Sequence, residues 1–239
     1  MNADDELPGR YASPPCLASE LAPDYFDPLA VDPQQARDVA RWRRSERTRL
    51  RGERDAISID ARQRADETIA NEVRDVLADR FAGARWQVLS AYWPMRGEPD
   101  LRALMTELEV SGVTVALPVV ETMARPLIFR RWTPTTQMVR GVWKIPIPSD
   151  EAETVTPTIV LAPLVGWDSE GYRLGYGGGY FDRTLASLAP RPFAIGVGYR
   201  ASRLKTIYPQ PHDIPFDIVL TEAGREVVRE VPSASRPIA

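Results

Sequence analysis

Six short runs rich in β-branched and aromatic residues constrain the fold of this chain more than any other feature of its sequence. The runs are WQVLSAYW (86–93), GVTVALPVV (112–120), PLIFRRW (126–132), TIVLAPLV (158–165), FAIGVGY (193–199) and DIVLTE (217–222). Helical stretches such as 100–112 and 180–190 lie between several of them. Nearly continuous apolar strands that alternate with helices are typical of a mostly parallel sheet covered on both faces. The sequence therefore predicts an α/β fold, in which only the run at 126–132, a short link after its predecessor, pairs antiparallel.

The chain before the first run divides into an arm and two helices. Residues 1–33 contain six prolines and scattered apolar residues, which predicts an irregular N-terminal arm. Helices are expected over 34–56 and 59–82, each after a helix start signal. We expect one α/β domain over 34–225, beginning with this helical pair, and a C-terminal tail at 226–239.

Composition and charge exclude several classes of protein. The formal net charge is −3 and the sequence pI is about 5.4, which argues against a general nucleic-acid-binding protein. Cys16 is the single cysteine of the sequence, which excludes an internal disulfide framework and a cysteine metal cluster. The sequence has no apolar run near the roughly 20 residues that span a bilayer, and its acidic N-terminus is unlike a secretory signal. We expect a cytoplasmic protein, a monomer or weak dimer, without membrane or nucleic-acid partners.

The stretch RLGYGGGYFD, residues 173–182, follows the run at 158–165 and precedes a predicted helix. Its four glycines allow positive φ and let backbone N–H groups turn toward an anion, at the sheet edge where parallel-sheet proteins bind ligands. The pattern is neither a Walker A loop nor a dinucleotide-binding fingerprint. A phosphate cradle and a turn without a ligand both stay open. Asp182 is favoured there by the helix dipole alone, but beside phosphates it would be a natural magnesium ligand.

The first predicted helix is unusually basic. Residues 37–54 contain eight arginines and three acids, and Arg43, Arg47 and Arg54 share one face of the helix. Such a face is either a solvated surface or a clamp for a polyanion such as a nucleoside triphosphate, whose oxygens match the forked arginine side chain.

Three further positions offer chemistry. Asp213, next to the single histidine of the sequence, His212, could reach the same cation as Asp182. Glu98 lies in a Gly-Glu-Pro turn after the first run, and Trp143 lies in a proline-stiffened loop suited to stacking on a flat heterocycle. Each segment also has a structural interpretation. Glu98 would then be a solvated turn acid, Trp143 a hydrophobic plug and His212 a structural histidine.

Taken together, these segments resemble the 5-formyltetrahydrofolate cyclo-ligase family over roughly residues 41–222. GWDSEGYRLGYGGGYFDRTL is similar to the family signature G-x-x-F-D-x-x-G-x-R-L-G-x-G-x-G-[YF]-[YF]-D, and a basic first helix, MRGEPD, WKIPIP and PHDIPFD occur in the family's order. The resemblance implies a cyclo-ligase (NagB-like) fold, a Rossmann-like three-layer sandwich. It implies conversion of 5-formyltetrahydrofolate to 5,10-methenyltetrahydrofolate, dependent on ATP and Mg²⁺, through a phosphorylated formyl group.

The resemblance also implies roles for individual residues. The positions that match nucleotide-binding residues are Arg43, Arg47, Gly175, Tyr176, Gly177, Gly178, Gly179 and Tyr180. The folate-type substrate would contact Glu98, Trp143 and Tyr180, the magnesium ligands would be Asp182 and Asp213, and the catalytic residues would be Arg173 and Tyr180. His212 is given no catalytic role.

Several positions depart from the family pattern, among them Glu46, which stands where leucine is usual. Tyr176 and Gly178 stand where some relatives carry Arg and Lys, and Ile147 stands where a polar residue is common. The departures leave open a cyclo-ligase-like paralogue that uses ATP on a different pterin, carbonyl or amide. A non-catalytic RNA- or protein-binding module is a third hypothesis, and the acidic charge of the whole chain counts against it.

Overall fold

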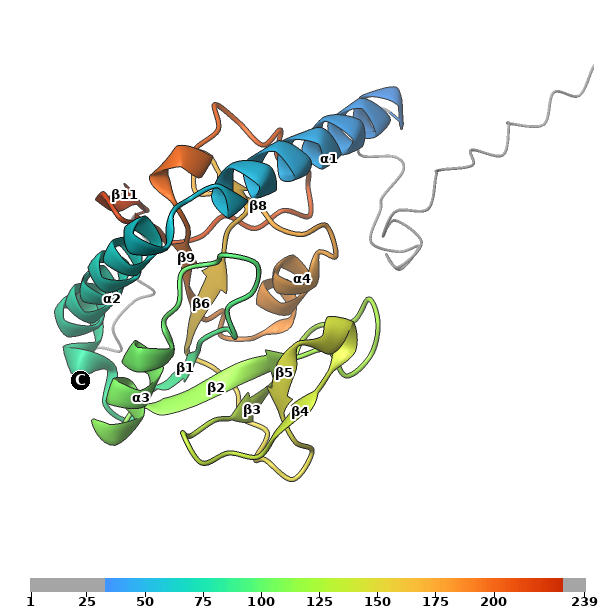
Figure 1. The fold of residues 1–239 in the computed structure, drawn as a ribbon. Helices are drawn as coiled ribbons and strands as arrows, with labels where there is room; N and C mark the ends of the chain where they lie inside the picture. Colours follow the sequence, from blue (N-terminus) through green and yellow to red (C-terminus); the bar gives the residue numbers. More distant parts are fainter. Residues whose placement is uncertain (1–32, 230–239) are drawn as a thin grey trace, which may run out of the picture.

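A seven-stranded sheet, in the order β11-β10-β9-β6-β1-β2-β3, forms the centre of the computed structural model, which describes residues 33–229 (Figure 1). Its strands are β1 (Val88–Ser90), β2 (Thr114–Val119), β3 (Ile128–Arg131), β6 (Ile159–Pro163), β9 (Phe193–Val197), β10 (Ile218–Thr221) and β11 (Gly224–Val228). The inner strands β2, β1, β6, β9 and β10 are parallel to one another, and the edge strands β3 and β11 pair antiparallel. The predicted α/β fold with a mostly parallel sheet is confirmed, as is the antiparallel pairing of β3.

Each predicted run contains one strand of the sheet, but β11 is not predicted from the sequence. Of its residues GREVV only Val227 is buried, because an edge strand on a tight hairpin covers little apolar surface. The strand continues the sheet past residue 225, which is the predicted end of the domain. The predicted arm, apart from Pro33, and residues 230–239 of the predicted tail lie outside the described residues.

The helices are α1 (Pro33–Asp55), α2 (Ile59–Phe81), α3 (Arg102–Val110) and α4 (Tyr180–Ser187), so the predicted N-terminal pair is present. Ser58 begins α2: its hydroxyl oxygen accepts a hydrogen bond from the N–H of Ala61 at 3.3 Å. Asp60 in the first turn adds a favourable charge at the positive end of the helix dipole.

Both faces of the sheet are covered. Ile159 of β6 belongs to a buried cluster with Val73 of α2 and Leu104 of α3, whereas the next residue, Val160, belongs to a second cluster with Leu185 of α4. Successive strand residues point to opposite faces, so a strand buried on both faces has no polar side. This explains why the predicted runs are almost continuously apolar.

Helix α1 covers neither face and instead crosses the carboxyl ends of the strands (Figure 1). Its Leu50 packs with Val165, Leu174 and Leu204 in a separate cluster beyond the sheet. A Cβ on Gly166 would lie 2.7 Å from the Leu50 side chain, so glycine permits this close approach. The helix thereby lies over the loops that follow the parallel strands.

Two small hairpins stand outside the main sheet. β4 (Met138–Arg140) pairs with β5 (Pro146–Pro148), and a 3-10 turn at Val142–Lys144 connects them. β7 (Gly166–Trp167) pairs with β8 (Arg173–Leu174), which leads into the glycine-rich stretch. No helix within residues 33–229 is both long and apolar enough to cross a membrane.

Candidate active site

The glycine loop, defined as residues 175–179, connects β8 to α4 at the carboxyl ends of the parallel strands, as the sequence predicts. Gly177 (φ +107°) and Gly179 (φ +61°) adopt left-handed backbone conformations that favour glycine. Gly179 is the N-cap of α4, and none of the described side chains caps this helix end. The first N–H groups of α4, which have no partner within the helix, therefore suit an anionic ligand.

Arg47 reaches the glycine loop from α1. Its Nε donates a hydrogen bond to the carbonyl oxygen of Gly175 at 2.7 Å, and a Cβ on Gly177 would lie 3.6 Å from its guanidinium carbon. Burial, together with repulsion from Arg43 and Arg173, lowers the pKa of Arg47 to about 10. This concentration of positive charge beside bare backbone is what a phosphate-binding loop requires.

Arg43, the second predicted nucleotide contact, already has protein partners. Its Nε donates to the carbonyl oxygen of Ile207 at 2.9 Å, and its Nη2 donates to that of Tyr208 at 2.8 Å. It also forms a bidentate ion pair with Asp213, whose side chain is 9% exposed. Burial lowers the pKa of the neighbouring His212. Arg43 thus anchors α1 to the loop at 207–213.

Arg173 forms a similar buried pair with Asp182. Its Nη2 lies 2.6 Å from Asp182 Oδ2, and the two side chains are 7% and 10% exposed. The other carboxylate oxygen of Asp182 accepts a hydrogen bond from the N–H of Ile214 at 3.2 Å. The predicted catalytic Arg173 therefore lies in a buried ion pair at the start of α4, beside the glycine loop.

Asp182 and Asp213, the predicted magnesium ligands, lie on adjoining segments, because Ile214, the residue after Asp213, contacts Asp182. Among residues 33–229 there is no group of three or more His, Cys, Asp or Glu side chains that could hold a metal ion. Magnesium at a nucleotide takes one or two carboxylates and completes its shell with phosphate oxygens and water. Two adjacent carboxylates fit that mode of binding, and they do not fit a site made of protein ligands alone.

Glu98 is buried in the loop after β1 and contacts the glycine loop. Its Oε1 accepts a hydrogen bond from the Tyr176 hydroxyl at 2.8 Å, and its Oε2 accepts one from the N–H of Met95 at 2.9 Å. Arg54 Nη2 donates to the same Tyr176 oxygen at 2.6 Å. Burial raises the pKa of Glu98, against the effect of the Tyr176 hydrogen bond, and burial also raises the pKa of Tyr176 to about 12.

Tyr180 and Trp143 form an aromatic pair on the other side of the glycine loop. Their rings lie 5.7 Å apart between centroids, at 75° to each other. Trp143 lies at the tip of the β4–β5 hairpin and is 50% exposed, with a left-handed φ of +54°. A half-exposed indole held by a hairpin offers a surface on which a flat heterocycle can stack.

The glycine loop connects most of the predicted site residues: Gly175 binds Arg47, Tyr176 binds Glu98, and Tyr180 at its end contacts Trp143. Arg54 lies on the predicted basic face of the helix, but its role is not predicted from the sequence. The missing signal is its contact with Tyr176, which is 122 residues away in the chain.

A sequence model of the 5-formyltetrahydrofolate cyclo-ligase family matches residues 39–222. The chain belongs to this family. It is 28% identical over 184 residues to the 5-formyltetrahydrofolate cyclo-ligase of Haemophilus influenzae, covering 73% of this chain and 95% of the relative. It is 34% identical over 142 residues to that of Mycolicibacterium smegmatis, covering 56% of this chain and 73% of the relative.

Solved cyclo-ligase structures share the fold. The 5,10-methenyltetrahydrofolate synthetase of Aquifex aeolicus matches with a TM-score of 0.64 and 27% identity, over 82% of this chain and 97% of that one. The synthetase of Mycoplasma pneumoniae matches in fold with a TM-score of 0.61 and 21% identity, over 75% of this chain and 98% of that one. The predicted cyclo-ligase fold and family are confirmed, and with them the prediction that this chain is an enzyme of the ligase class.

Proposed function

We propose that this cyclo-ligase converts 5-formyltetrahydrofolate to 5,10-methenyltetrahydrofolate, consuming ATP in the presence of Mg²⁺. The observation that supports this best is the glycine loop, along which Gly175 contacts Arg47, Tyr176 contacts Glu98, and Tyr180 after the loop contacts Trp143. Arg47 has the charge for a triphosphate, and Glu98 and the aromatic pair provide an acceptor and aromatic rings for a pterin.

On the nucleotide side, the bare backbone of the glycine loop and the guanidinium of Arg47 would bind phosphate oxygens. The buried charge of Arg47, which Arg43 and Arg173 oppose, gains a partner when an anion arrives. Phosphoryl transfer to the formyl oxygen needs positioning and charge neutralisation rather than a nucleophile from the protein. ADP then leaves, and the neighbouring folate N–H nitrogen attacks the activated carbon. The nitrogen loses its proton to solvent, and the carbon–oxygen bond breaks as phosphate departs.

Asp182 and Asp213 would hold the magnesium ion, which neutralises charge on the phosphates. Both carboxylates are paired with arginines in this structure, Asp182 with Arg173 and Asp213 with Arg43. An arginine that shares its carboxylate with a cation has N–H groups left for phosphate oxygens. The two ion pairs therefore hold the carboxylates in place until the nucleotide binds.

On the folate side, Glu98 would accept hydrogen bonds from N–H groups of the heterocycle, and the exposed ring of Trp143 would stack on it. Tyr180 lies next to Trp143, at the first position of α4 directly after the glycine loop. Its hydroxyl accepts a hydrogen bond from the N–H of Ala124 at 3.3 Å, which fixes the ring beside Trp143.

The test is the absorbance of the methenyl product when purified protein is mixed with 5-formyltetrahydrofolate, ATP and Mg²⁺. We expect an increase that matches the ADP released and that disappears when ATP is omitted or Mg²⁺ is chelated. No increase at saturating substrates would reject the proposal. Retained ATP binding in that case would favour a cyclo-ligase-like enzyme with another pterin, carbonyl or amide substrate.

A further inference from the structure

Arg54, in the last turn of α1, is a buried arginine whose hydrogen bonds are incomplete. The residue is 6% exposed, and its Nε and Nη1 atoms have no hydrogen-bond partner among the described residues. Its Nη2 donates to the Tyr176 hydroxyl at 2.6 Å. Keeping a buried charge in this state is costly, so the position calls for a functional explanation.

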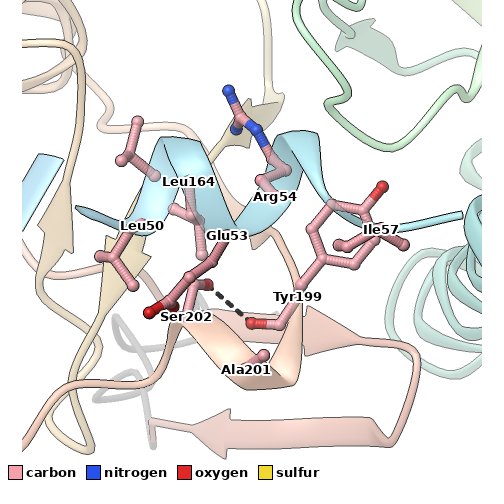
Figure 2. A pocket seen from close by; sticks show the side chains of 9 residues that line it. Leu50, Glu53, Arg54, Ile57, Leu164, Tyr199, Ala201 and Ser202 are labelled. Atoms are coloured by element: carbon pink, nitrogen blue, oxygen red, sulfur yellow. Dashed lines mark hydrogen bonds between the residues drawn. The ribbon is translucent and has the colours of Figure 1, made fainter. Parts of the chain in front are cut away.

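The position of Arg54 in the fold suggests such an explanation. In this sheet the strand order reverses between β1 and β6, and open parallel sheets bind ligands at such a switch point. The stem of Arg54 lines a cavity of about 50 Å³ together with Leu164 and Val165 after β6 and Tyr199 after β9. Figure 2 shows its guanidinium turned away from Ala201, the cavity residue at the bottom of the view.

A short chain of hydrogen bonds leads from Arg54 to Glu98. Arg54 donates to the Tyr176 oxygen, so the single hydroxyl hydrogen of Tyr176 is directed to Glu98 Oε1, 2.8 Å away. The tyrosine cannot turn its hydrogen toward the arginine, because a guanidinium only donates. The chain therefore fixes one oxygen of the Glu98 carboxylate and places a positive charge behind it.

We propose that Arg54 is a positioning residue, which through Tyr176 holds Glu98 as an oriented anion for an N–H group of the folate substrate's heterocycle. The inference rests on the proposed function, since it concerns the same substrate. It is supported by the pKa of Glu98, which burial raises and the charge of Arg54 lowers. Without the arginine, Glu98 would take up a proton at higher pH and lose its ability to accept that N–H group.

Other charged or titratable groups lie around Glu98 and the loop that carries it. Tyr176 and Arg54 act on Glu98 itself, Tyr92 interacts with Glu98 and with Asp66, Asp100 and Tyr199, and Arg62 lies beside Gly97. Asp66 is the group whose titration could be mistaken for that of Glu98 in the acid limb, because burial raises its pKa too. It accepts a hydrogen bond from the N–H of Asp100 and is not part of the Arg54–Tyr176–Glu98 chain.

The experiment measures the KM for the folate substrate and the acid limb of kcat/KM in wild type, Arg54→Met, Arg54→Lys and Tyr176→Phe. We expect Arg54→Met to raise the folate KM about 10-fold, leave the ATP KM within 2-fold, and move the acid limb to higher pH. Arg54→Lys keeps the positive charge, so its folate KM and its acid limb should move less than those of Arg54→Met. Tyr176→Phe should reproduce the effects of Arg54→Met, and adding Arg54→Met to Tyr176→Phe should change little more.

Two controls separate this role from a structural one. The acid limb should persist in Asp66→Asn and disappear in Glu98→Gln. If Arg54→Met fails to fold, the shifts in Arg54→Lys and Tyr176→Phe decide the question. An active wild type whose acid limb does not move in the Arg54 or Tyr176 variants would overturn this inference alone. An inactive wild type would overturn the proposed function and the inference with it.

Discussion

Asp182 and Glu98 are both buried carboxylates beside the glycine loop, and they are paired in different ways. Asp182 contacts Arg173 directly at 2.6 Å, whereas Glu98 is separated from Arg54 by the Tyr176 hydroxyl. A direct pair balances the charge and fixes both side chains. A pair joined through a tyrosine leaves the carboxylate less neutralised, and burial accordingly raises the pKa of Glu98. The first arrangement suits a structural anchor that a cation can share, and the second suits an acceptor waiting for a substrate.

The largest effect is expected at the direct pair. Asp182→Asn leaves the buried Arg173 charge without its partner, so the free energy of unfolding should fall by about 3–5 kcal/mol, and ATP-dependent turnover should be lost. Urea unfolding and the methenyl assay measure the two effects. Asp38→Asn is the matched control, because its pair with Arg41 is exposed and long at 3.8 Å. A loss of less than 1 kcal/mol would show that the pair is not the anchor described above.

At Glu98, which reaches Arg54 only through Tyr176, we expect activity to fall and the pH dependence of stability to weaken. Glu98→Gln removes the charge and one of the two acceptor oxygens, so kcat/KM for the folate substrate should fall about 10- to 100-fold, and the cost of a buried anion at neutral pH should disappear. The reason lies in how proton binding by Glu98 is coupled to folding. A carboxyl whose pKa is raised on folding stabilises the fold below its unfolded pKa, and this stabilisation is lost as pH rises through the folded value.

The pH dependence of stability checks this sign. The stability of Glu98→Gln relative to wild type should increase as pH rises from the ordinary pKa of glutamate through the raised pKa of Glu98, and it should stay constant below that window. Glu107→Gln is the control, because Glu107 is exposed and its pair with Arg74 lowers its pKa instead. A stability difference between wild type and Glu98→Gln that does not change with pH would contradict the description of Glu98 as a poorly neutralised anion.

A smaller effect is expected from Arg47, which contributes charge without a carboxylate partner among residues 33–229. Arg47→Ala should raise the KM for ATP about 10-fold and leave the KM for the folate substrate almost unchanged, because a charge-assisted hydrogen bond to phosphate is lost. Arg49→Ala is the comparison, since Arg49 lies on the same helix but pairs with Glu46 and Glu53 at the surface. The reverse pattern of KM values would remove Arg47 from the nucleotide side.

The smallest effect is expected at the aromatic rim. Trp143→Phe should raise the folate KM two- to five-fold, because a smaller ring keeps part of the stacking surface. Quenching of protein fluorescence by the folate substrate should weaken in parallel. Trp86→Phe, at a tryptophan that is 90% exposed, should change neither measurement. Equal effects of the two substitutions would argue against stacking on Trp143.

The sheet could be predicted from the sequence because burial on both faces leaves a direct mark on it, as in TIVLAPLV around β6. The position of the glycine loop could also be predicted, since four glycines between a strand and a helix have few alternatives. The hairpins β4–β5 and β7–β8 could not, because strands of two or three residues show no periodicity. The edge strand β11 was missed for a related reason, since most of its side chains face solvent.

The pairing of the site residues was beyond prediction from the sequence alone. A resemblance to relatives suggests that Arg43 and Asp213 belong to one site, but not that they contact each other across 170 residues of chain. Arg54 shows the limit most clearly. On a helix with eight arginines, nothing local distinguishes a buried arginine from one in solvent. Only the fold, which brings Tyr176 and Glu98 to the end of α1, gives Arg54 its partners.

The anchoring of α1 by Arg43 has a consequence for how the protein is made. Helix α1 leaves the ribosome well before Ile207 and Asp213, to which Arg43 binds, because these residues are 164 and 170 positions further along the chain. At about 5–20 residues per second, Ile207 is synthesised roughly 8–33 s after Arg43. During that interval Arg43 is without these partners. A chain interrupted before Ile207 would contain most strands of the sheet but not the residues that anchor α1. The contacts that hold α1 over the glycine loop are therefore expected to be complete only after Asp213 has been synthesised.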